Sequence, residues 1–389
     1  MTLEFLPANH PINRIRPELL ERLRRAQLNL ITRQFGSARE LCEQACREAG
    51  VDARLAESLR REPLLPFADL SRSSLIAKLL TAGASLGLSQ AAVSLVAERV
   101  QLIRAFEDPA SVVETVRKKV ELVVSKFPTK AAHIEQGTNP GDLLDPFITA
   151  ATQELMYGGS VQGAIEATAS HKAMMMIEGL IGHLHEDVIG AMRGNVRVPE
   201  PRGVEQEELD FVANPFPGAD IAQPPWGEGQ AKVRFHQVKS KTGSAKGGDA
   251  KRLGQQLKLL SKTYQADVYY DALIGKSLKG HRSKAGVLRE APIAVVLVGQ
   301  AAFLALTGSA SGAELLLRVY QSAFRDVAHS SGYSIGKIAG AIAAEFRSRA
   351  KSEGDDFLQL LLHDVTSGDP REQDSRSYKS QGRGRKAAE

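Results

Sequence analysis

The chain has 389 residues, which is enough for two domains or for one large domain with an extension. Its apolar content of 43% is typical of a globular protein, and its aromatic content of 5% argues against a protein that mainly stacks single-stranded bases. The net charge of +5 is a mild basic bias, which indicates an anionic partner only where the charge is clustered.

The N-terminal segment lacks the pattern of a signal peptide, because residues 1–20 contain Asn, Pro and Arg where an apolar core would lie. No stretch reaches the roughly 18 uninterrupted apolar residues of a membrane span. We therefore expect a soluble, cytoplasmic protein. Cys42 and Cys46 are expected to be idle or buried thiols, since no further Cys or His cluster completes a metal site.

Residues 1–155 are predicted to form an α-helical domain. Segments 18–35 and 108–127 carry apolar residues at three- and four-residue spacing, and Asp108-Pro109 is a favourable helix start. Strand-like patterns are absent from this region.

Residues 79–100 resemble a helix-turn-helix inside this domain. Gly83 and Gly87 would allow close packing, Ser89 would cap a second helix, and Val93 and Val96 would face the first. The face that would read DNA offers few basic residues, so a plain helical hairpin is the alternative interpretation.

Residues 156–365 are predicted to form a second domain of the α/β (α+β) class, with a mixed central sheet flanked by helices, because strand and helix patterns interleave. The final residues, 366–389, contain too little apolar surface to order and are expected to be a disordered basic tail. The expected helices cover 161–194, 250–264, 313–330 and 334–351, and the expected strands cover 196–198, 209–213, 231–240, 266–275 and 293–299.

Three polar residues stand out around the strand at 231–240. Gln237 and Lys239 point the same way because strand side chains repeat every two residues, while Val238 points to the opposite face. Asp220 follows a Pro-Gly turn at the mouth of an earlier strand. If the two strands pair as a hairpin, a carboxylate, an amide oxygen and an ammonium meet at one place.

This set suits metal-assisted hydrolysis of a phosphodiester. Mg²⁺ prefers oxygen ligands and activates a bound water, and Lys239 would position or deprotonate that water. The basic loop and helix after the strand would hold DNA phosphates. The residues expected to do so are Lys241, Lys246, Lys251 and Arg252.

Asp220, the Gln-Val-Lys strand and the basic, Gly-containing segment after it resemble the PD-(D/E)XK nucleases, and most closely type II restriction endonucleases, over roughly residues 182–308. The resemblance implies a restriction-endonuclease-like core, a homodimer and Mg²⁺-dependent cleavage of double-stranded DNA at specific sequences. It also implies a role in phage defence, with a cognate DNA methyltransferase as genetic partner. Asp220, Gln237 and Glu186 would then hold the metal, with Lys239 completing the catalytic set.

The chain departs from the family pattern in two places. Ala219 precedes Asp220 where the family has Pro, and the middle acid is replaced by Gln237, which offers only a neutral carbonyl oxygen. Glu186 matches the family's Glu on the preceding helix, although it lies roughly opposite an apolar stripe. Glu178, nearer the edge of that stripe, is the rival.

Base recognition is expected from the basic segment 275–290, interpreted as a loop between two strands. The residues expected nearest the DNA are His281 and Arg282, with Lys276 and Lys279 beside them. Two alternative functions remain open. One is a noncatalytic DNA-binding protein with a degraded nuclease core, favoured by Gln237; the other is a modification-dependent nuclease that senses methylated bases.

Overall fold

The computed structural model describes residues 2–127, 145–199, 209–227, 229–241, 249–275 and 282–332, together with residues 340, 343, 344, 348, 358 and 362. Contacts divide the chain into two units. The first contains residues 1–118 and 181–325, and the second contains residues 119–180 and 326–389. This division places the N-terminal helices in the same unit as the sheet, which differs from the boundary expected near residue 155. The expected tail at 366–389 lies outside the described residues.

The N-terminal part of the first unit is helical. Its apolar core contains Cys42 and Cys46, which are free and buried. Serine side chains cap three of these helices, each accepting a hydrogen bond from a main-chain N–H group in the first turn. The α-helices are α1 (Pro17–Leu28), α2 (Ile31–Gln34), α3 (Ala38–Ala49), α4 (Leu64–Ala68), α5 (Arg72–Ala82), α6 (Gln90–Ala105) and α7 (Pro109–Val124), of which α7 continues into the second unit from residue 119, and the 3₁₀ helices are η1 (Pro11–Arg14), η2 (Ala53–Leu59) and η3 (Ala84–Leu86).

The helix-turn-helix-like segment forms a helical hairpin of α5, η3 and α6. Ser89 caps α6 through a 3.2 Å hydrogen bond from the Ala92 N–H, and Val93 and Val96 are fully buried, as the sequence predicts. Gly87 adopts a positive φ of 63° at the turn, a conformation that favours glycine. These facts establish the hairpin; a DNA-reading role stays a prediction.

Helices α9 (Pro146–Tyr157) and the first part of α10 (Val161–Gly190) belong to the second unit, and α10 continues into the first from residue 181. The expected long helix is therefore confirmed to residue 190. Most of the helix expected at 334–351 lies outside the described residues.

A five-stranded mixed sheet forms the centre of the first unit. It contains β1 (Val196–Arg197), β2 (Ile221–Gln223), β3 (Arg234–Lys241), β4 (Asp267–Ile274) and β5 (Val295–Val298), in the order in which they occur along the chain. The pairs β1–β2 and β2–β3 are antiparallel, whereas β3–β4 and β4–β5 are parallel. The expected α/β class with a mixed central sheet is thus confirmed.

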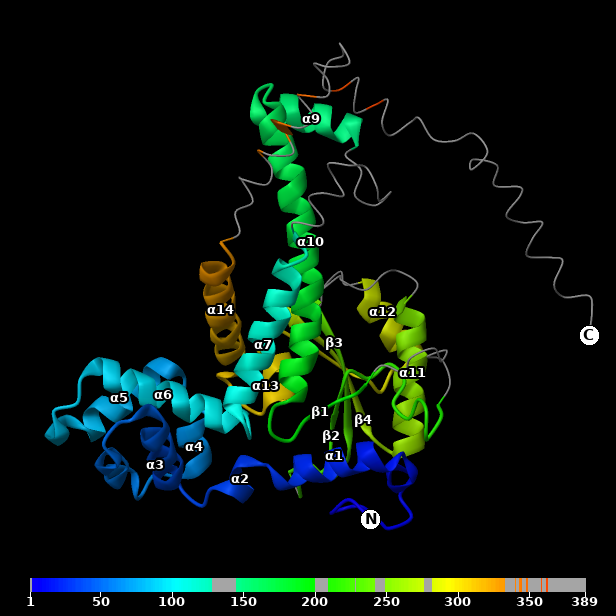
Figure 1. Cartoon of the computed structure of the whole chain (residues 1–389). Coiled ribbons are helices and arrows are strands. Elements are labelled where there is room, and N and C mark those ends of the chain that lie inside the picture. The colour runs from blue at the N-terminus through cyan, green and yellow to red at the C-terminus, as the bar shows by residue number, and fades with distance from the viewer. Residues whose placement is uncertain are drawn as a thin grey trace, which may run out of the picture. The chain divides into compact units, whose positions relative to one another are not determined.

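Helices make the two parallel connections and cover the sheet. α11 (Asp249–Tyr264) joins β3 to β4, and α12 (Arg282–Glu290) joins β4 to β5. Both lie on one side of the sheet, while the end of α10 and α13 (Gln300–Thr307) lie on the other (Figure 1). α14 (Gly312–Ser331) follows α13.

The apolar core under α11 is centred on three aromatic rings that come from distant segments. Phe216 lies 4.6 Å from Phe235 of β3, and Tyr264 of α11 contacts both rings at 5.4 and 5.5 Å between centroids. Aromatic pairs at these separations stabilise a core beyond the area that they bury. This core holds the chain before β2 against β3, and so it positions the residues that begin at Asp220.

Two sequence predictions are wrong. Residues 209–213, expected to be a strand, form a bend, because the Asp210 carboxylate accepts hydrogen bonds from the N–H groups of Val212 and Ala213. The basic segment expected to be a loop is helical from Arg282, because a parallel β4–β5 pair requires a crossover connection.

In the part of the chain that the structure describes, no single helix is long and apolar enough to cross a membrane. Only α13 and α14 taken together pass that test of length and composition, and they are bent by 86° at the break between them.

Candidate active site

The main chain holds Asp220 between two neighbouring strands. Its N–H donates to the His236 carbonyl at 2.8 Å, and its own carbonyl accepts from the Val198 N–H at 2.9 Å. The turn before it requires Gly218, which has a φ of 76° and where an added Cβ would collide with the Gln256 side chain of α11. The Pro-Gly turn therefore delivers Asp220 to a defined position at the start of β2.

Antiparallel pairing of β2 with β3 brings Asp220 to Gln237, as the sequence predicts. The register pairs Ile221 with His236, so that Asp220 lies opposite Gln237. The Gln237 side-chain Nε2 donates to Asp220 Oδ2 at 2.6 Å, and the Val238 N–H donates to the same oxygen at 2.7 Å. Among the described residues, Asp220 Oδ1 accepts no hydrogen bond.

Lys239 lies two residues after Gln237 on β3 and is half-buried, whereas Gln237 itself is buried. The period of two places both side chains on one face of the strand. The positive charge of Lys239 lies close enough to Asp220 to lower the pKa of that carboxyl. The ammonium and the carboxylate therefore belong to one electrostatic site.

Glu186 of α10 lies near enough to Asp220 for its charge to act on the pKa of that carboxyl. Its Oε2 accepts from Arg197 Nη2 of β1 at 2.8 Å, and Arg197 Nε lies 2.8 Å from Asp187 Oδ1. Gly190 permits this contact, because a Cβ there would lie 2.5 Å from the Arg197 Cβ. The side chain of Glu186 is half-buried rather than on a solvated face. Glu178, the rival residue, is exposed and belongs to the other unit.

Burial, and after it the negative charge of Glu186, raise the pKa of the Asp220 carboxyl to about 7. The charges of Lys239 and Arg197, and the hydrogen bond from Val238, act in the opposite direction. A pKa raised by burial and by a neighbouring like charge is a common feature of functional sites. A cation bound beside Asp220 would favour the ionised form of its carboxyl.

The donor set fits a hard divalent cation through the Asp220 carboxylate, the Glu186 carboxylate and the Gln237 amide oxygen, with the remaining ligands supplied by water or phosphate. No group of three or more His, Cys, Asp and Glu side chains gathers anywhere in the described ranges. Gln237 is neutral, so a cation at the candidate site would meet less negative charge than at a site with a third acid.

The predicted DNA-binding residues are described only in part. Lys251 is exposed and Arg252 is half-buried on the first turn of α11, and Arg282 begins α12. The Lys241 main chain pairs with Ile274 at the end of β3, but the side chains of Lys241 and Arg282 lie outside the described part, as do Lys246, Lys276, Lys279 and His281.

Sequence reasoning missed two features of the site. The first is Arg197, which contacts both Glu186 and Asp187 of α10. The sequence could have indicated it, because it is a charged residue between the two valines of a short strand. The other feature is a buried network behind the site. His236 Nδ1 lies 2.8 Å from Asp271 Oδ2 of β4, and His236 Nε2 lies 3.2 Å from Gln223 Oε1 of β2. The alternation of β3 places His236 on the face opposite Gln237. From the sequence alone, that face is expected to be apolar.

No protein-family model matches the chain, and no curated protein matches it significantly.

Proposed function

We propose that the chain is a Mg²⁺-dependent endonuclease of the PD-(D/E)XK type, which cuts double-stranded DNA at specific sequences as type II restriction endonucleases do. The observation that carries the proposal is the meeting of Asp220 with Gln237, 2.6 Å apart across an antiparallel strand pair, with Lys239 two residues further along the same face. Carboxylate, amide oxygen and ammonium together are the groups that phosphodiester hydrolysis needs.

The topology supports the proposal. Asp220 and Lys239 lie on adjacent antiparallel strands, and β3 then continues through α11 into the parallel strand β4. We include in the proposal that this mixed sheet and its helices form a restriction-endonuclease-like core.

Each site residue has a role that its position makes possible. Asp220 and Glu186 supply negative charge, and Gln237 supplies a neutral oxygen. Lys239 orients the attacking water as an ammonium, and in its neutral amine form would take a proton from that water. Arg197 holds the Glu186 carboxylate in place through the 2.8 Å hydrogen bond. Mg²⁺, when bound, would lower the pKa of a coordinated water and offset charge on the phosphate.

DNA would approach the edge of the sheet where β3 ends. The exposed Lys251 on α11, with Arg252, Lys241 and Lys246 near it in sequence, would contact phosphates. Arg282, His281, Lys276 and Lys279 would lie nearest the bases. A homodimer would cut both strands, and a DNA methyltransferase encoded nearby would protect the host sequence.

The noncatalytic alternative is favoured by one contact. The Gln237 amide nitrogen, not its oxygen, faces Asp220, and an amide N–H donated to a carboxylate stabilises that carboxylate without any metal. In this alternative the nuclease core binds DNA but no longer cuts it. A modification-dependent nuclease would retain the same catalytic residues and cut only methylated DNA.

One experiment separates these functions. Unmodified and methylated phage DNA are incubated with the protein in Mg²⁺ or EDTA, beside Lys239→Ala. The matched control is Lys232→Ala, which removes an exposed lysine that pairs with Asp267 at 3.5 Å just before the same strand. Discrete Mg²⁺-dependent fragments that disappear in Lys239→Ala, but persist in Lys232→Ala, support the proposal. DNA binding without cleavage of any substrate refutes it, and cleavage of methylated DNA alone supports the modification-dependent enzyme.

A further inference from the structure

A cavity of about 340 Å³ lies within the first unit, apart from the candidate active site. Its wall combines residues from α2, α4, α6, β2 and the end of α13, and its volume is in the range of small-molecule binding sites. Leu30, Leu65 and Leu306 form apolar parts of the wall, and Trp226, the single tryptophan of the chain, lies beside them.

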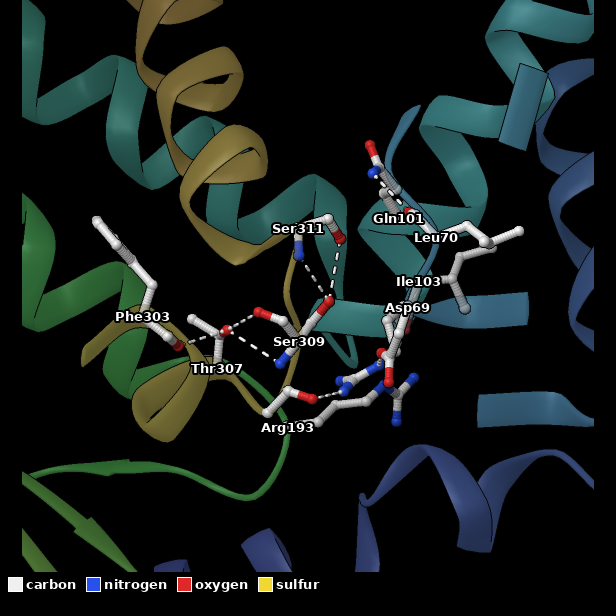
Figure 2. Close-up of polar contacts among 11 residues, drawn as sticks. Asp69, Leu70, Gln101, Ile103, Arg193, Phe303, Thr307, Ser309 and Ser311 are labelled. Atoms are coloured by element: carbon white, nitrogen blue, oxygen red, sulfur yellow. Dashed lines mark hydrogen bonds and ion pairs between the residues drawn. The ribbon is translucent and has the colours of Figure 1, made fainter. Parts of the chain in front are cut away.

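Two arginines that line this cavity are held in place by the main chain. Arg193 donates from Nε to the Ile103 carbonyl at 2.9 Å and from Nη1 to the Asn29 carbonyl at 2.6 Å. Arg104 donates from Nη2 to the Gly308 carbonyl at 2.9 Å. Figure 2 draws Arg193, Ile103 and Asp69 among the residues of this region. Each guanidinium keeps one terminal nitrogen, Nη2 of Arg193 and Nη1 of Arg104, without a hydrogen bond to the described residues.

Hydrogen bonds in the turn after α13 rigidify one side of the cavity. Thr307 Oγ1 donates to the Phe303 carbonyl at 2.8 Å and accepts from the Ser309 N–H, and the Ser309 and Ser311 hydroxyls lie 3.0 Å apart (Figure 2). These contacts fix the Gly308 carbonyl that Arg104 binds. The two guanidinium groups are therefore preorganised rather than free to turn away from each other.

The charges of the cavity wall do not balance. Asp69 Oδ1 pairs with Arg104 Nε at 2.9 Å, and a third lining arginine, Arg33, pairs with Glu4 at 2.5 Å. Arg193 binds only neutral carbonyls, and the nearby Glu107 is already engaged by Arg25. Burial lowers the pKa of Arg193, the charge of Glu107 raises it, and the charge of Arg104 lowers it. Within the described residues, the half-buried Arg193 thus has no hydrogen-bonded anionic partner, which an anion in the cavity would supply.

We propose that this cavity binds a small organic anion, in which one carboxylate or phosphate group meets Arg193 and Arg104 and an apolar or aromatic body lies against Leu30, Leu65, Leu306 and Trp226. Rigid, forked guanidinium donors suit both oxyanions, and the apolar wall distinguishes such a ligand from a bare ion. The site goes beyond the proposed nuclease activity and does not depend on it.

Trp226 makes the test direct, because all tryptophan fluorescence of the chain comes from the cavity wall. The full-length protein is titrated with phenyl phosphate, with benzoate, and with neutral benzamide. We expect saturable fluorescence changes with one or both anions, at dissociation constants on the order of 1 mM for ligands of this size, and at least tenfold weaker binding of benzamide. The two anions distinguish a phosphate ligand from a carboxylate ligand.

Two variants separate charge recognition from folding. Arg193→Gln should weaken anion binding at least tenfold, whereas Arg193→Lys, which keeps the charge, should retain part of it. Arg289→Gln, which removes an exposed arginine outside the cavity, is the matched control, and circular dichroism checks that each variant is folded. Asp220→Asn should bind the anions normally, because that residue serves the other site.

Three outcomes would overturn the inference. They are equal binding of benzamide and the anions, undiminished anion binding by folded Arg193→Gln, and a fluorescence change that duplex DNA or inorganic phosphate produces but neither aromatic anion does. The last result would assign the arginines to DNA contact or to bare-ion binding.

Discussion

The side chains of Asp220 and Gln237 share a 2.6 Å hydrogen bond in which Gln237 Nε2 donates to Asp220 Oδ2. Gln237 stands where the family pattern has an acid. It binds Asp220 through a neutral amide group. The Gln237 Oε1 and the Asp220 Oδ1 remain the oxygens that a cation would use. This arrangement makes Gln237 the residue whose substitution is most informative.

Gln237→Glu should raise Mg²⁺ affinity at least tenfold, because it adds a negative charge beside Asp220. Gln237→Leu, of similar size, should abolish detectable cleavage, because it removes the amide oxygen. Isothermal titration with Mg²⁺ and a plasmid-cleavage assay measure the two effects. A Glu variant that binds Mg²⁺ no more tightly would show that Gln237 is not a ligand.

Mg²⁺ binding should depend on pH through Asp220. The pKa of this carboxyl is about 7, so below pH 7 the metal must displace a proton. Apparent affinity should fall about tenfold for each pH unit below 7 and level off above it. Glu186→Gln removes the neighbouring negative charge that helps to raise this pKa, so the plateau should begin at a lower pH. A pH-independent Mg²⁺ affinity between pH 5 and 8 would contradict the prediction.

Asp220→Asn should stabilise the metal-free protein at pH 8 but not at pH 4. The folded-state pKa of Asp220 lies above its ordinary value of 3.8, so its favourable contribution is present below about pH 4 and is lost as the pH rises through 7. Between these values the loss is about 1.4 kcal/mol per pH unit. Urea unfolding in EDTA at both pH values measures it. Equal effects of the substitution at pH 4 and pH 8 would count against the raised pKa.

His185 should make the fold sensitive to acid. Burial against Tyr320, whose hydroxyl lies 3.3 Å from His185 Nδ1, lowers the pKa of this histidine to about 4. The stability that its neutral form contributes is present above pH 6.5 and is lost as the pH falls toward 4, at about 1.4 kcal/mol per pH unit. His185→Leu should flatten this part of the stability profile, as followed by thermal melting. An unchanged slope in that variant would assign acid sensitivity to other groups.

The buried pair of His236 and Asp271 should be costly to break. Both side chains are fully buried, and burial raises the pKa of Asp271 while the nearby His236 lowers it. Asp271→Leu leaves His236 Nδ1 buried without its partner, and should destabilise the protein by about 3–5 kcal/mol. His236→Leu combined with Asp271→Leu should recover part of that loss, as urea unfolding would show. A double variant less stable than Asp271→Leu would contradict this account.

Local patterns predicted those parts of the site that depend on backbone geometry alone. The alternation of a strand places Gln237 and Lys239 on one face, and the Pro-Gly turn before Asp220 follows from the conformational freedom of Gly218. The strands at 267–274 and 295–298 and the helix at 249–264 were predicted from their own periodicity. The basic segment after residue 275 was misassigned because a helical crossover of nine residues carries too short a pattern to be distinguished from a loop.

The contacts between helices and strands that are distant in sequence could not be predicted from the sequence. A helical projection placed Glu186 opposite an apolar stripe, but β1 packs on the end of α10 and turns Arg197 toward this carboxylate. The contact of His236 with Asp271 joins residues 35 apart, and that of Arg104 with the Gly308 carbonyl joins residues 204 apart. The sequence therefore specified which residues can carry the chemistry and which way each strand presents them, since those properties are local. Burial, charge pairing and the raised pKa of Asp220 arose only when strands and helices from distant parts of the chain excluded water together.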